Sequence, residues 1–140
     1  MRFHDHARFH GFVDTSSPWR SIRHSRIIVS VRRVIRSSRY ERAAARLLRP
    51  SVQQELEESI AAEPERHPLI PGTGGFRKVR WCRPGGGKSG GVRVIYYFML
   101  RPDVIFLADM YAKNEKENLT HAERNQLQKF ASEIQREFGG

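Results

Sequence analysis

The chain has 140 residues, a formal net charge of +10 and one cysteine, Cys82. This length fits a single domain with a modest core, and one cysteine excludes both an internal disulfide and a zinc site built from several cysteines, so a reducing cytoplasm is the expected location. No apolar run approaches the ~18 residues that a membrane-spanning helix needs, and no apolar segment of a secretory signal follows the first residues, so no membrane partner is expected.

Residues 1–28 are rich in arginine, histidine and serine and show no hydrophobic periodicity. We predict that they form a disordered basic extension, and we do not expect their scattered histidines to bind a metal ion. Two alternatives stay open. One is an organellar transit peptide, which has the same arginine-rich and acid-poor composition; the other is a start codon assigned too far upstream of a valine start between positions 29 and 34. Residues 29–140 are predicted to be the folded domain.

The folded domain is predicted to begin with a strand and two helices. The stretch "IIVSVRRVI", Ile27–Ile35, has the β-branched composition of a strand. Each helix is predicted to start at a capping box, Ser38–Glu41 in the first and Ser51–Gln54 in the second. Pro50 should end the first helix and Pro64 the second. Apolar residues at helical spacing give each helix one buried stripe: Tyr40, Ala44, Leu47 and Leu48, then Val52, Leu56 and Ile60.

Three strands and one helix are predicted after the loop His67–Gly75. The strands are "FRKVRWC", "VRVIYYFML" and "VIFLADMY", separated by a glycine-rich turn at 85–91 and a proline turn at 101–104. The last helix should start at the capping box Thr120–Glu123 and end at Gly139. This order predicts an α+β fold, an antiparallel sheet with an N-terminal helical hairpin and a C-terminal helix packed on it.

The positive charge is concentrated in two parts of the chain. Residues 1–50 contain twelve arginines against three acidic residues, and residues 71–101 contain seven basic residues and no acidic one. A basic segment without acids favours polyanionic partners, which include nucleic acid, anionic lipid and acidic protein segments. In the second segment the basic residues alternate along predicted strands. This pattern indicates an ordered basic surface, and not only charge that keeps the protein soluble.

The stretch "GGGKSGG" resembles the end of a phosphate-binding loop, but two features exclude that function. The loop requires a glycine five residues before Gly87, and Cys82 occupies that position. The segment that follows, "VRVIYYF", has the composition of a strand, so no helix N-terminus would be present to bind a phosphate. We therefore do not expect nucleotide hydrolysis.

Strand alternation places several basic residues on one face of the sheet. Lys78 and Arg80 share one face of their strand, and Arg93 and Tyr97 share one face of the next. If the valines between these residues all face the same core, the four side chains project together on the opposite side. Arginine and lysine bind phosphates, and an aromatic ring can stack on an unpaired base, so this face is predicted to contact nucleic acid.

Three segments, "GTGGFRKVRW", "GKSGGVRVIYYF" and "YAKNEKENLT", resemble successive signatures of the RelE/ParE toxin superfamily, in its HigB-like branch. The resemblance extends over about residues 31–138. It implies a RelE-like fold and the activity of a bacterial type II toxin, a metal-independent and cofactor-free endoribonuclease that cleaves mRNA on the ribosome. It also implies a cognate helix-turn-helix antitoxin that covers the basic face.

The resemblance implies catalytic roles for four basic residues: Arg93, Lys78, Arg80 and Lys113. Further RNA contacts are expected from four residues: Arg77, Lys88, Tyr97 and Lys116. Some relatives also have a second arginine and a tyrosine where this chain has Asn114 and Thr120. Either Lys116, Tyr111 or Tyr97 substitutes for these groups, or the cleavage mechanism differs.

Two other functions are compatible with the same fold. A ParE-like toxin would block DNA gyrase by protein contact, and a nucleic-acid-binding module would bind without catalysis. The basic array around Arg93 favours the nuclease, because a gyrase inhibitor has no need for a phosphate site.

Overall fold

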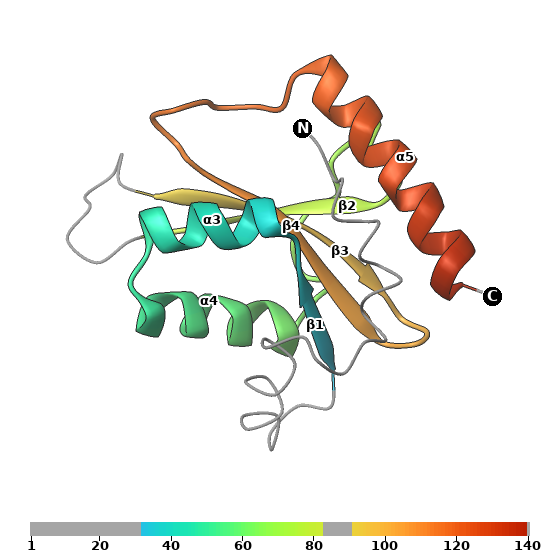
Figure 1. Cartoon of the computed structure of the whole chain (residues 1–140), viewed down its shortest axis with the longest axis horizontal. Coiled ribbons are helices and arrows are strands. Elements are labelled where there is room, and N and C mark those ends of the chain that lie inside the picture. The colour runs from blue at the N-terminus through green and yellow to red at the C-terminus, as the bar shows by residue number, and fades with distance from the viewer. Residues whose placement is uncertain (1–31, 83–90, 140) are drawn as a thin grey trace.

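The computed structural model describes residues 32–82 and 91–139, which form four strands and three helices (Figure 1). In chain order the elements are β1 (Arg33–Arg36), α3 (Ser38–Leu47), α4 (Pro50–Ala62), β2 (Phe76–Trp81), β3 (Val92–Met99), β4 (Val104–Ala112) and α5 (His121–Phe138). The predicted α+β order is confirmed. Within the described residues, no helix is long and apolar enough to cross a membrane.

The four strands form one sheet in the order β1-β4-β3-β2. β2, β3 and β4 form the predicted antiparallel meander. β1 pairs with β4 in parallel, with Arg33 opposite Val104 and Arg36 opposite Leu107, so the sheet is mostly and not wholly antiparallel. Local sequence patterns did not indicate this pairing, because the two strands are separated by both helices of the hairpin and two other strands.

Helices cover both faces of the sheet (Figure 1). On one face α3 and α4 pack over a cluster that includes Tyr40, Leu56 and Val94. On the other face α5 packs over a cluster that includes Phe106 and Leu127. Every residue of β4 is buried, which agrees with its nearly continuous apolar sequence, because this strand lies inside the sheet and has a helix on each side.

The helix starts agree with the predictions at one site of three. The capping box of Thr120 and Glu123 is present at the start of α5. At α3 the cap is Ser37 and not Ser38, since the Ser37 hydroxyl accepts the backbone N–H of Tyr40 at 3.0 Å. At α4 the prediction is wrong, because the helix starts at Pro50 with no side-chain cap. Proline suits the first helical position, where its missing N–H would have no partner within the helix.

The two helices of the hairpin are joined to β1 by a buried polar network centred on Glu57. The Glu57 carboxylate accepts two hydrogen bonds from the Arg36 guanidinium, at 2.6 and 3.0 Å, and one from the Tyr40 hydroxyl at 2.9 Å. Gln53 donates a fourth bond at 3.0 Å.

The first predicted strand, Ile27–Ile35, corresponds to β1. Its residues 27–31 lie outside the described residues, and β1 itself begins at Arg33.

Candidate functional site

A cavity of about 350 Å³ opens on the α5 face of the sheet, where the basic residues of β2 and β3 come together. Its lining residues come from β2, β3 and the loops before β2 and after β4: His67, Pro68, Lys78, Arg80, Arg93, Glu117 and Asn118. The predicted alternation explains the grouping. Val79 pairs with Val94, and both belong to the cluster under α3 and α4, so Lys78, Arg80 and Arg93 point to the opposite face.

Arg93 is the most buried cation of this cavity, with 5% of its surface exposed. It lies directly opposite Arg80 in the ladder between β2 and β3. Within residues 32–82 and 91–139, neither arginine nor Lys78 forms an ion pair with a carboxylate. Like charges opposite one another destabilise a sheet, so this arrangement is unfavourable until an anion binds between them.

The same crowding lowers the pKa of Lys78. Burial is the largest cause, followed by the positive charges of Arg93, Arg80 and Arg124, while Glu117 opposes the shift. The Lys78 ammonium donates a long hydrogen bond of 3.4 Å to the side-chain oxygen of Asn118. A lysine with a lowered pKa is neutral more often near neutral pH, which allows it to take part in proton transfer as well as in charge stabilisation.

The family model for the RelE toxin of the RelE/RelB toxin-antitoxin system matches residues 33–138 of this chain. The chain belongs to the RelE toxin family. As a RelE-family member it is the toxin of a type II toxin-antitoxin system, and the family implies a RelB-type antitoxin as its partner.

Two solved structures of the Escherichia coli RelE toxin are similar to this RelE-family toxin. The isolated E. coli toxin is 14% identical, with a TM-score of 0.43, over 77% of this chain and 100% of that chain. A double arginine-to-alanine mutant in the free state is 19% identical, with a TM-score of 0.42, over 61% of this chain and 87% of that chain.

Four lining residues of this RelE-family cavity were not predicted as site residues: His67, Pro68, Glu117 and Asn118. Arg124 was not predicted either, and it is close enough to affect the pKa of Lys78. Arg124 belongs to the first turn of α5, and its buried Nε has no hydrogen-bond partner among the described residues. The segment "YAKNEKENLT" contained Glu117 and Asn118, but sequence alone did not show that this loop returns to β2.

Two of the residues predicted to contact RNA have their side chains engaged within the fold and do not line this cavity. Tyr97 faces the predicted side of the sheet, but it is buried under α5, packs against Phe76 at 5.0 Å between ring centroids and accepts a hydrogen bond from Gln135 at 2.7 Å. Its ring is therefore not available to stack on a base. Arg77 points to the other face from Lys78 and donates to the backbone carbonyls of Glu65 and His67.

Lys113 and Lys116 are not among the lining residues of this cavity. Lys113 follows β4, and its backbone N–H donates to Gly91 at 3.1 Å, beside the start of β3. Lys116 pairs with Glu123, and its ammonium lies 5.0 Å from the centre of the Tyr111 ring. Lys88 lies outside the described residues. Among the described residues of the toxin, no group of three or more side chains is arranged to hold a metal ion.

Proposed function

We propose that this RelE-family toxin is an endoribonuclease of the HigB-like type that cleaves mRNA on the ribosome. The supporting observation is the convergence of Lys78, Arg80 and Arg93 on one cavity without a carboxylate partner in the described part of the chain. A cavity with this charge and geometry suits a single phosphodiester group.

The reaction is an internal transfer within the RNA. The ribose 2′-oxygen loses its proton and attacks the adjacent phosphorus, the bond from phosphorus to the 5′-oxygen breaks, and that oxygen gains a proton. Negative charge increases on the phosphoryl oxygens in the transition state. Fixed guanidinium and ammonium groups in a partly dry site stabilise this charge without reorganising, which is the role proposed for Arg93 and Arg80.

Lys78 is the proposed proton acceptor, because burial and the neighbouring arginines lower its pKa and so increase its neutral fraction. Some relatives have a second arginine at the position of Asn114. In this toxin Arg124 is proposed to replace part of that positive charge, because it approaches the cavity from α5. Lys113 and Lys116 are proposed as phosphate contacts along the RNA outside the cavity, and Lys88 is proposed as a further contact with the RNA.

The proposed antitoxin has a helix-turn-helix domain and inhibits the toxin through an acidic segment. Residues 71–101 contain no acidic side chain, so a carboxylate-rich segment would complement the charge of this region. Occupation of the cavity by carboxylates would exclude the RNA phosphate from Arg93.

Induced expression of the wild type, Arg93→Ala and a matched control, Arg136→Ala, tests the proposal. Arg136 is an exposed arginine in the last turn of α5, so its substitution removes the same charge far from the cavity. We expect growth arrest and codon-phased transcript ends with the wild type and the control, and neither with Arg93→Ala. Growth arrest with intact transcripts and broken chromosomes would instead identify a gyrase inhibitor.

A further inference from the structure

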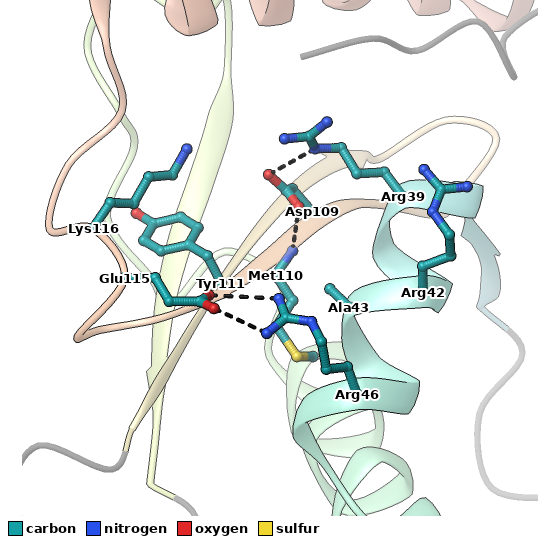
Figure 2. Close-up of a pocket in the computed structure, with 9 residues that line it drawn as sticks. All are labelled: Arg39, Arg42, Ala43, Arg46, Asp109, Met110, Tyr111, Glu115 and Lys116. Carbon is teal, nitrogen blue, oxygen red and sulfur yellow. Dashed lines mark hydrogen bonds and ion pairs between the residues drawn. The ribbon is translucent and has the colours of Figure 1, made fainter.

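A second cavity, of about 540 Å³, lies between α3 and the end of β4 (Figure 2). Its lining residues come from α3, β4 and the loop that follows β4: Arg39, Arg42, Ala43, Arg46, Asp109, Met110, Tyr111, Glu115 and Lys116. We call it the α3 cleft. The loop that contributes Glu115 and Lys116 to this cleft also contributes Glu117 and Asn118 to the first cavity, so the two cavities are neighbours.

The α3 cleft exists because β4 loses its strand partner halfway along. β1 pairs only with Val104–Leu107 of β4, and beyond that point side chains satisfy the open edge. The Asp109 carboxylate accepts the backbone N–H of Met110 at 2.8 Å, and Glu115 accepts that of Ala112 at 3.2 Å. A buried carboxylate, Asp109, therefore lies on the floor of the cleft and still has lone pairs for another donor.

Three arginines of α3 line the wall of the cleft opposite β4. Arg39, Arg42 and Arg46 are spaced three and four residues apart, so they lie on one face of the helix. Figure 2 shows Arg39 directed to Asp109 and Arg46 directed to Glu115, with Arg42 directed to neither carboxylate. The hydrogen bond described for Arg42 is a long one of 3.3 Å to Ser38.

These arginines can exchange their present partners for a phosphate. The pair between Arg46 and Glu115 is exposed, at 56% and 45% of the two side chains, and such pairs contribute little to stability. The Nε of Arg39 is buried without a hydrogen-bond partner in the described ranges, because its 3.3 Å approach to Asp109 is an ion pair of poor hydrogen-bond geometry. Guanidinium groups bind phosphate oxygens through two parallel N–H groups.

The α3 cleft adjoins the cavity of the proposed cleavage site across a single strand pair. Tyr111 lines the cleft, and Arg93 is its direct partner in the ladder between β3 and β4. Directly paired residues in such a ladder have Cα atoms about 5 Å apart. A chain with one phosphate at Arg93 can therefore place its next residue in the cleft.

We propose that the α3 cleft binds one nucleotide of single-stranded RNA next to the bond that is cleaved. Arg42 and Arg46 hold its phosphate, and Asp109 accepts an N–H group from the edge of its base, beside the ring of Tyr111. RNA fits the cleft better than an acidic peptide does, because Asp109 and Glu115 repel carboxylates but accept the amino groups of bases. The inference rests on the proposed ribonuclease function. The nucleotide can belong to messenger RNA or to ribosomal RNA, because both have the same phosphates and bases.

Binding of uncleavable single-stranded RNA tests this inference separately from catalysis. The probes are 2′-O-methyl hexanucleotides that differ in one base, and the proteins are the full chain, Arg42→Ala, Asp109→Asn and the control Arg136→Ala. We expect Arg42→Ala to weaken binding at least 5-fold and to reduce the slope of log K against log[salt] by about 0.7, the value for one phosphate contact on a single strand. Asp109→Asn should change which base is preferred, since an amide also donates.

A second arm distinguishes the two sources of RNA. Transcript ends are mapped in cells, and affinity for purified ribosomes without mRNA is measured, both with the same variants. If the cleft binds mRNA, Asp109→Asn changes the nucleotides that flank the cuts. If it binds ribosomal RNA, affinity for the empty ribosome falls and the cuts stay in place.

Three results would overturn the inference. The first is unchanged RNA affinity in Arg42→Ala together with unchanged base preference in Asp109→Asn. If the wild type still cleaves transcripts normally in the same cells, this result rejects the cleft inference and leaves the ribonuclease function intact. Loss of antitoxin binding in Arg42→Ala, with RNA binding retained, would make the cleft a protein contact. No binding of any probe or ribosome by the wild type would also reject it. Thermal melting of each variant checks that it is folded, and Arg42 is exposed enough to be replaced safely.

Discussion

The two faces of the sheet contain charged clusters of opposite character. Under α3 and α4, Glu57 is surrounded by Arg36, Tyr40 and Gln53, so that every group has a partner. On the α5 face, Arg80 and Arg93 lie opposite one another, and the described residues place no carboxylate in an ion pair with either. The first arrangement is complete within the fold, whereas the second is complete only with an external anion. Charge that the fold leaves uncompensated is therefore the better guide to a binding site.

The largest effect is expected for Glu57→Ala on stability. Removal of the carboxylate leaves Arg36 buried and uncompensated, which costs about 3–5 kcal/mol of unfolding free energy. Denaturant unfolding of the variant and the wild type measures this difference in free energy. The matched control is Glu63→Ala, which breaks an exposed pair with Arg66 and should change stability by less than about 1 kcal/mol. Equal effects of the two substitutions would remove the distinction between the faces.

A slightly smaller effect, on activity and not on stability, is expected for Arg93→Ala. Loss of one charge-stabilising donor should reduce the cleavage rate about 10²–10³-fold, measured by single-turnover cleavage of mRNA on programmed ribosomes. The melting temperature should stay the same or rise, because repulsion with Arg80 is removed. A large fall in melting temperature would show that Arg93 is structural, like Arg36.

A change in the pH dependence is expected for Lys78→Arg. The folded-state pKa of Lys78 lies below 10.5, so the wild-type rate should rise with pH through that pKa as the amine loses its proton. Arginine stays protonated, so this limb should disappear in the variant. The same shift makes the folded chain bind this proton less tightly than the unfolded chain, so stability should increase from the folded pKa up to 10.5. An identical pH profile in Lys78→Arg would exclude Lys78 as the proton acceptor.

Arg80→Ala should move this limb to higher pH, because it removes a positive charge that lowers the pKa of Lys78. Arg136→Ala, remote from the cavity, should leave the limb in place. If both variants behave alike, the cations of the cavity do not act on one another.

The smallest effect is expected at the start of α3. Ser37→Ala removes the cap on Tyr40 and a 2.7 Å bond to the carbonyl of Ala108, at a cost of about 1–2 kcal/mol in unfolding free energy. Ser38→Ala, one residue later, should cost less than about 0.5 kcal/mol. A larger loss of stability in Ser38→Ala than in Ser37→Ala would indicate that Ser38 caps the helix, as the sequence predicted.

Local periodicity was sufficient to predict the element order and the shared face of Lys78, Arg80 and Arg93. Both depend on a repeat of two or 3.6 residues that is visible in any short segment. Periodicity also placed Tyr97 on the correct face, but it did not show that α5 covers that ring. Arg124 and Asn118 were missed for the same reason, since their position depends on how a helix and a loop pack on strands distant in the sequence. The parallel pairing of β1 with β4 is another long-range contact without a local signal.

That parallel pairing has a consequence for the order in which the protein is made. β1 is an early strand and its neighbour β4 is the last one, so the sheet cannot close during synthesis until residue 112 has left the ribosome. The loop that completes the cation cavity follows later still, with Glu117 and Asn118. A nascent toxin therefore has no assembled cavity until the loop that follows β4 has left the ribosome.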